Sequence, residues 1–174
     1  ELVRLRRDVT IHDLLTHLGG LGYEVFHEAR EKDWNFDQFI AEIVKRPLHR
    51  QPGVMWEYSA SCDVLGRLVE IISGRPFDVF LKERIFTPLG MTDSAPGFSR
   101  LKGSNRAWGH GRIDGPIRGT GHMQALGEAS GTDLVKPAGG ICASTRDMAR
   151  WLSVQLAMGN ADPCLWYQFM DQAA

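Results

Sequence analysis

Tyr58 is the residue whose type and place in this sequence most directly suggest chemistry. It follows a turn marked by Pro52 and Gly53, and it stands just before an apolar run with helical spacing that ends at Gly74. The positive end of a helix dipole favours a phenolate over a phenol, and a tyrosine needs such help to act as a general base, because its ordinary pKa is about 10. A tyrosine before a helix is more often an amphipathic packing residue whose hydroxyl group is satisfied, so the position alone leaves both roles open.

The helix that would position Tyr58 is predicted to end at Gly74, where a helix C-terminus favours a residue free to take positive φ. Ser59 or Ser61 is suited to cap its start, and Asp63 lies near the first turn. The apolar side chains that recur at helical spacing and are expected to be buried are Val64, Leu65, Leu68, Val69 and Ile72.

A second helix is predicted to begin after Thr10, because Thr10 and Asp13 have the spacing of a capping box. Gly19 and Gly20 are expected to stop it. Its apolar stripe consists of Ile11, Leu14, Leu15 and Leu18.

Three more helices are expected. One spans about residues 35–45, with Asn35 as its cap, another opens at Pro76, and a third is capped by Ser144 with Asp147 as its box partner. The side chains expected on the buried faces of the first two are Phe36, Phe39, Ile40, Ile43 and Val44, and then Phe77, Phe80, Leu81 and Ile85.

The stretch from about residue 92 to 136 holds no regular period, apart from short strands expected around 107–113 and 116–118. Such a long irregular stretch in a compact domain usually borders a site. Directly after it, Gly139 and Gly140 would let the backbone approach another element or a ligand closely.

Composition excludes several classes of protein. The 174 residues are 43% hydrophobic and 24% charged, which suits one domain with a core, and the net charge of −1 gives no reason to expect a nucleic-acid or anionic-membrane partner. No apolar run has the length of a membrane span. The three cysteines are too few and too scattered for a disulfide framework or a zinc site, and the six histidines lack metal-site spacing, so no metal is expected. His12 and His17 are expected on the surface or packed against a helix.

Three segments in order resemble the serine β-lactamase superfamily, and more narrowly its class C branch of β-lactamases, D,D-peptidases and family VIII carboxylesterases. They are Pro-x-x-x-Trp-x-Tyr-Ser at 52–59, Val-Leu-Gly-Arg-Leu-Val-Glu-Ile-Ile-Ser-Gly-Arg-Pro-Phe at 64–77, and Pro-Leu-Gly-Met-Thr-Asp at 88–93. The Leu-Leu-x-His helix and the Pro-Ala-Gly-Gly segment also match, so the resemblance covers about residues 10–156. It implies an α+β, β-lactamase/transpeptidase-like fold, of which this chain is mainly the helical region with irregular loops and a few short strands.

The resemblance also implies roles. Tyr58 matches the tyrosine that relays the proton of the nucleophilic serine, and Gly139 and Gly140 lie in a segment that packs beside the active site. Ala60 stands where β-lactamases of this branch have an asparagine that hydrogen-bonds the amide side chain of the β-lactam. A methyl group cannot do so, which can cost roughly 1–3 kcal/mol. The resemblance therefore ranks ester hydrolysis or acyl transfer above efficient β-lactam hydrolysis, with no cofactor.

The family's Ser-x-x-Lys motif lies upstream of the Leu-Leu-x-His helix, and none is found there in the 174 residues; nor is there a Lys-Thr-Gly or His-x-Gly strand after the Pro-Ala-Gly-Gly segment. We therefore expect residues 1–174 to be a single incomplete domain, the middle of a larger enzyme that is inactive in isolation. The expected partner is a small ester, amide or β-lactam substrate. The alternatives are a non-catalytic module of the same fold, or an efficient β-lactamase or D,D-peptidase. The sequence predicts neither the oligomeric state nor the cellular compartment.

Overall fold

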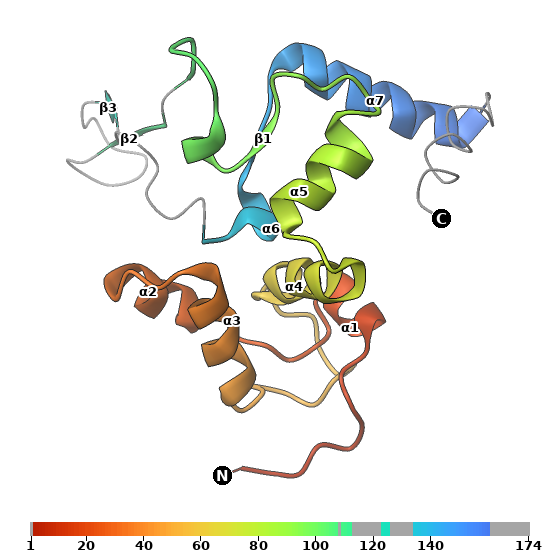
Figure 1. The fold of residues 1–174 in the computed structure, drawn as a ribbon. Coiled ribbons are helices and arrows are strands. Elements are labelled where there is room, and N and C mark those ends of the chain that lie inside the picture. Colours follow the sequence, from red (N-terminus) through yellow and green to blue (C-terminus); the bar gives the residue numbers. More distant parts are fainter. Residues whose placement is uncertain (1, 108, 113–122, 126–133, 161–174) are drawn as a thin grey trace.

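The structure is a computed structural model that describes residues 2–107, 109–112, 123–125 and 134–160 (Figure 1). Its helical elements are α1 (Ile11–Leu15), α2 (Glu24–Glu31), α3 (Phe36–Lys45), α4 (Ser61–Ser73), α5 (Phe77–Leu81), the π-helix η1 (Lys82–Phe86), the 3-10 helix η2 (Phe98–Arg100), α6 (Lys136–Gly139) and α7 (Thr145–Asn160). Strand β1 (Ala95–Pro96) pairs antiparallel with β4 (Ile141–Cys142), and β2 (His110–Arg112) pairs antiparallel with β3 (Met123–Ala125). The predicted α+β class is confirmed.

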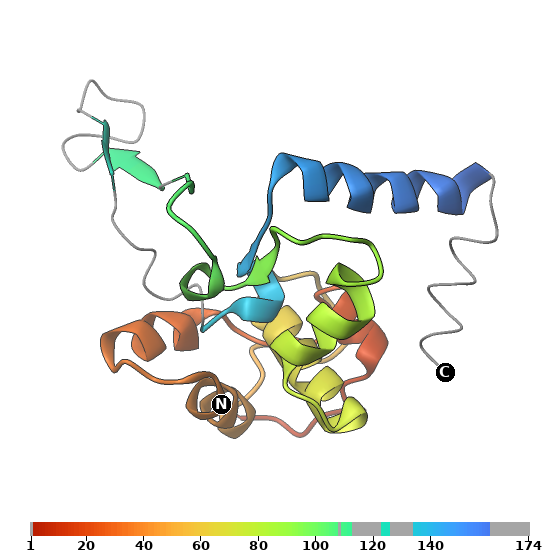
Figure 2. The ribbon, with the colours of Figure 1, turned by 45° about the horizontal axis from the view of Figure 1, so that its top comes forward.

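Helix α4 lies in the middle of the molecule, between α1 on one side and the α2–α3 pair on the other (Figure 1). Helix α7 runs along the opposite edge from that pair, beyond α5 (Figure 2). Within the described part of the chain, none of the helices is both long and apolar enough to cross a membrane.

Two helices begin with the predicted caps. At α1, the Asp13 N–H donates to Thr10 Oγ1 (3.2 Å) and the Thr10 N–H donates to Asp13 Oδ2 (2.8 Å), which completes the capping box. Asn35 makes the corresponding box with Gln38 at the start of α3. These caps need only residues three positions apart, so local sequence is sufficient to specify them.

Helix α1 ends earlier than predicted. Its last helical residue is Leu15, and His17 already adopts a φ of 56°, before Gly19 and Gly20 are reached. Of the predicted apolar stripe, Leu14 is buried, whereas Ile11 and Leu15 are exposed.

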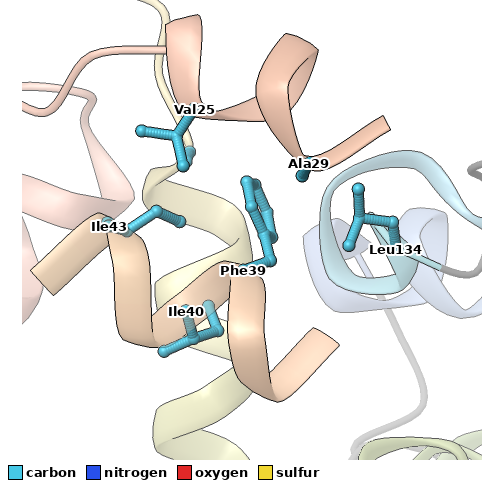
Figure 3. Packing of buried hydrophobic residues seen from close by; sticks show 7 residues of the cluster. Val25, Ala29, Phe39, Ile40, Ile43 and Leu134 are labelled. Atoms are coloured by element: carbon cyan, nitrogen blue, oxygen red, sulfur yellow. The ribbon is translucent and has the colours of Figure 1, made fainter. Parts of the chain in front are cut away.

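The main core lies between α2 and α3. Phe39 stands at its centre, facing Val25 and Ala29 of α2 on one side and Leu134 on another (Figure 3). Ile40, Ile43 and Ala60 complete the buried set. The prediction for Val44 is wrong, because it turns away from this core and is exposed.

The start and burial of α4 differ from the prediction. Its N-cap position is Ala60, with no side-chain cap, because the hydroxyl groups of Ser59 and Ser61 lie 2.7 Å apart and hydrogen-bond each other. Gly74 has a φ of 65° and ends the helix as predicted. The apolar stripe is half-buried and Ile72 is exposed. The fully buried positions of α4 are instead Ser61, Asp63 and Gly66.

Pro76 starts α5 as predicted, and the helix continues into η1. A second apolar cluster forms there from Leu81, Phe86 and Met91, with half-buried Ile85 and with Trp151 of α7 packed against it. This cluster ties α5 and η1 to α7.

Ser144 caps α7 as predicted, since its Oγ accepts the Asp147 N–H at 3.2 Å. The Asp147 carboxylate does not complete the box, however. Its Oδ2 accepts hydrogen bonds from Asp93 N and Ser94 Oγ, both at 2.8 Å. The side chain of Asp147 is fully buried. Its carboxylate therefore accepts hydrogen bonds from a loop 53 positions away and not from the backbone at its own helix start.

The strand expected around 107–113 is present as β2, whereas the one expected at 116–118 lies outside the described residues. The tail after Asn160, with Cys164, also lies outside them.

Candidate active site

Tyr58 lies at the surface immediately before α4, with 55% of its surface exposed. Its phenol ring is flanked by two other rings. The imidazole of His17 is stacked on it, with centroids 5.4 Å apart and planes at 24°, and Tyr23 lies 5.2 Å away at 55°. The predicted position of Tyr58, at the N-terminal end of the helix, is thus confirmed, and its ring stands between two aromatic neighbours.

His17 was predicted to lie on the surface or to pack against a helix, and it packs against the start of α4. Its Nδ1 is 3.3 Å from Ser59 Oγ, its Nε2 is 3.9 Å from Cys62 Sγ, and its ring meets Trp56 edge-on at 6.1 Å. Sequence reasoning missed this link to Tyr58. The signal available was the Leu-Leu-x-His motif itself, but the 40 positions between the two residues carry no periodicity that would pair them.

The backbone fixes the segments that carry these rings against each other. The Glu57 N–H donates to His17 O (3.0 Å), and the Gly53 N–H donates to Leu18 O (2.8 Å). Gly20 has a φ of 74°, and a Cβ there would lie 2.3 Å from Arg50 O, so only glycine fits this crossing. The pairing of His17 with Tyr58 therefore rests on rigid main-chain contacts.

Tyr23 supplies a protonated hydroxyl beside Tyr58. Burial raises the pKa of Tyr23, and the neighbouring Tyr58 and the Asp63 carboxylate raise it further. Its ring is held from the other side by Phe26, at a centroid distance of 5.1 Å. Tyr23 is therefore suited to donate a hydrogen bond rather than to ionise.

Asp63 is the most unusual group near the two tyrosines. It is 0% exposed, and neither carboxylate oxygen has a hydrogen-bond partner among the described residues. Burial raises its pKa to about 7, although the N–H groups of Ala138 and of Asp63 itself partly oppose the rise. Those N–H groups donate elsewhere, to Val135 O and Ala60 O, each at 3.1 Å. Near neutral pH, Asp63 therefore exchanges between a neutral and a charged form.

Helix α6 meets α4 at a place the sequence did not indicate. A Cβ on Gly66 would lie 2.1 Å from Pro137 Cγ, so Gly66 is the glycine that permits close approach. Gly139 is exposed, and a Cβ there would have no atom within 4 Å, so no described element approaches Gly139 closely, and the other alternative, a ligand, stays a prediction. Gly140 is buried, and its carbonyl accepts the Gly97 N–H at 2.7 Å.

Ala60, the third residue predicted to bind substrate, is 1% exposed and belongs to the main core. Its methyl group fills space beside α2 and α3. As the side chain is apolar, it adds no hydrogen-bonding group at this point of the site.

A cluster of charges lies next to both tyrosines. His49 Nε2 is 2.8 Å from Glu24 Oε1, and His49 Nδ1 is 3.2 Å from Glu57 Oε1. Arg50 Nε donates to Glu57 Oε2 at 3.1 Å. Hydrogen bonds to Glu57 and then Glu24 raise the pKa of His49. Glu24 directly follows Tyr23, and Glu57 directly precedes Tyr58. Through His49, the cluster therefore connects the segment that carries Tyr23 with the segment that carries Tyr58.

The described residues include no group of three or more His, Cys, Asp or Glu side chains arranged to hold a metal ion. The groups that the structure brings together at this site are the phenols of Tyr58 and Tyr23, the imidazole of His17 and the buried carboxyl of Asp63. They are suited to hold and move a proton.

Comparison with known proteins places this chain in a family. The family model described as Beta-lactamase matches residues 4–164. The chain is 36% identical over 98 residues to Esterase EstB of Burkholderia gladioli and 35% identical over 97 residues to the lovastatin esterase of Penicillium rubens, matches that cover 49% and 51% of this chain but 25% and 24% of those proteins.

Among solved structures, the D-stereospecific amidohydrolase from Streptomyces sp. is similar with a TM-score of 0.69, at 19% identity, over 94% of this chain and 52% of that one. This likeness is one of fold. The chain thus spans about half the length of that amidohydrolase. The segments that match the two esterases span about a quarter of the length of each esterase. With a family match over nearly its whole length and this fold, the chain belongs to the Beta-lactamase family.

Proposed function

We propose that this chain is the central part of one larger domain, a serine hydrolase that cleaves esters through an acyl-enzyme, with Tyr58 as the proton relay. The observation that carries the proposal is the half-exposed phenol of Tyr58 at the start of α4, held between His17 and Tyr23. The nucleophilic serine would come from a part of the protein outside these 174 residues, so the chain alone should not turn over substrate.

In the proposed reaction, the phenolate of Tyr58 accepts the proton of the serine hydroxyl as the serine oxygen bonds to the carbonyl carbon. The proton then passes to the leaving alcohol as its bond to that carbon breaks. Water, or a second alcohol, next bonds to the acyl carbon while its proton passes to Tyr58, and the serine oxygen takes this proton back as its bond to the acyl carbon breaks. Tyr23 donates its hydroxyl hydrogen toward Tyr58 in both halves of the cycle and so supports the charged form.

Two observations favour esters over β-lactams. The curated relatives named above are esterases, and amides including β-lactams remain the second substrate class because the fold is shared with an amidohydrolase. Ala60 offers no polar side chain for the amide of a β-lactam. We propose that Gly139 borders the substrate through its exposed backbone, and that Gly140 and Ala60 shape the site from beneath.

The test uses the full-length protein that carries this chain. Intact mass is measured after incubation with a fluorophosphonate, and turnover is measured with a short-chain p-nitrophenyl ester and with a penicillin. The expected result is a stoichiometric phosphonate adduct, ester turnover exceeding penicillin turnover, and a kcat lowered by orders of magnitude in Tyr58→Phe with an unchanged circular dichroism spectrum.

Near-normal turnover by the Tyr58→Phe variant would exclude the relay role. A folded wild-type protein that gains no mass from any reagent would support the alternative, a non-catalytic module with this fold. Faster turnover of penicillin than of the ester would reverse the substrate order.

A further inference from the structure

We propose that His17 is a positioning residue for Tyr58, whose imidazole holds the phenol ring in the orientation that proton relay requires. The inference rests on the proposed function of Tyr58. Tyr58 is 55% exposed, so solvent alone would leave its ring free to change rotamer. The stacked imidazole, with its plane within 24° of that of the phenol, supplies a flat surface that restricts this freedom.

The imidazole can act as a support because it is itself held on several sides. Its Nδ1 lies 3.3 Å from Ser59 Oγ, which is buried and hydrogen-bonded to the fully buried Ser61 Oγ at 2.7 Å. Its Nε2 lies 3.9 Å from Cys62 Sγ. These partners belong to the start of α4 or directly precede it, so the ring is fixed relative to the helix that follows Tyr58.

The backbone of His17 points to the same role. Its φ of 56° lies in the left-handed region, which disfavours a residue with a side chain. Glycine or asparagine would fit this turn with less strain, yet the position holds an imidazole that makes the contacts above. The turn is closed by the Leu18 N–H donating to Asp13 O (2.8 Å), and the Glu57 N–H binds His17 O. The strained turn thus delivers the imidazole to the tyrosine segment.

The test compares three variants in the full-length protein. His17→Asn suits the left-handed backbone but removes the ring, whereas His17→Phe keeps an aromatic face and loses the polar contacts. Ser59→Ala leaves the ring and the backbone intact and releases Nδ1. His12→Asn is the matched control, because His12 is an exposed histidine of α1, the helix that precedes His17.

His17→Asn is expected to lower kcat for the p-nitrophenyl ester roughly 10- to 100-fold while KM changes less than about twofold, since misorientation of a relay group affects the chemical step more than binding. His17→Phe is expected to recover part of this loss, because the stacking face returns. Ser59→Ala should lower kcat by a smaller factor, about three- to tenfold. His12→Asn should match wild type.

Normal kcat in a folded His17→Asn variant would overturn the proposal. If His17→Asn does not fold, Ser59→Ala decides, and a folded Ser59→Ala protein with unchanged kcat would overturn it equally. Tyr58→Phe is measured alongside, because an active Tyr58→Phe variant rejects the proposed function itself, whereas an inactive one with normal His17 variants rejects only the positioning role.

Discussion

Gly66 of α4 lies so close to Pro137 of α6 that a Cβ on Gly66 would stand 2.1 Å from Pro137 Cγ and 2.5 Å from Pro137 Cβ. The proline ring is rigid and cannot rotate away. The helix that follows Tyr58 and the segment that contains Gly139 are therefore packed with no room for a single added methyl group.

Gly66→Ala should destabilise the protein, because the new methyl group must push α6 away from α4. Overpacking of this kind typically costs about 1–3 kcal/mol, which chemical denaturation of the full-length protein would measure. Gly139→Ala is the matched control, since its Cβ would meet no atom within 4 Å and its stability should stay at the wild-type level. Equal stability of the two variants would contradict the packing described.

Gly139→Ala also tests the proposed place of substrate. With folding unaffected, a methyl group beside a bound ester should raise KM roughly three- to tenfold and leave kcat nearly unchanged, because it weakens the ground state and the transition state alike. Steady-state kinetics with p-nitrophenyl esters of increasing chain length would show the effect. An unchanged KM for all chain lengths would place the substrate elsewhere.

Asp63 should make the stability of the protein depend on pH. Its pKa is raised from 3.8 to about 7 in the folded state, so the folded protein binds more protons than the unfolded chain between these values, and stability falls as pH rises through this window. A shift of about three pKa units corresponds to a total fall on the order of 4 kcal/mol. Well above pH 7, where Asp63 is fully ionised in both states, the contribution is constant.

Asp63→Asn should remove this dependence of the unfolding free energy on pH. The buried amide adds a cost that is the same at every pH, so the change with pH, and not the absolute free energy, is the quantity that tests the prediction. Unfolding free energies measured from pH 4 to 8 would reveal it. Asp8→Asn, at an exposed aspartate near the N-terminus, should keep the wild-type slope. A wild-type slope in Asp63→Asn would show that the pH dependence does not come from Asp63.

His49 should contribute in the same direction over a higher range. Its pKa is raised by Glu57 and Glu24, so its stabilising effect is present in full below its ordinary pKa of about 6.5 and is lost as pH rises through the raised value. His49→Gln should therefore lower the thermal midpoint at pH 6 and have little effect at pH 9. The effect is modest because His49 is partly exposed and screened by solvent. His12→Gln serves as control, and a pH-independent loss in His49→Gln would argue for packing alone.

Several features could be predicted from the sequence because they depend on neighbouring positions. The capping boxes of Thr10 and Asn35 join residues three apart, and Gly74 ends α4 through its own backbone freedom. The family resemblance likewise rests on contiguous motifs, and from them Tyr58 could be named and placed before a helix. In each case the determining interactions lie within one or two turns of chain.

Tertiary structure decided which residues surround Tyr58 and which side of α4 is buried. His17 reaches Tyr58 across 40 intervening residues, and the side chain of Asp147 binds the loop at Ser94 in preference to its own helix start. Hydrophobic periodicity predicted an apolar buried face for α4, yet Gly66 and Asp63 occupy it. Close packing against α6 leaves room only for a glycine at position 66. Asp63 lies on the same buried side of α4, so its carboxyl is in the interior. Such selection depends on the shape of the partner element, which the local sequence of α4 does not contain.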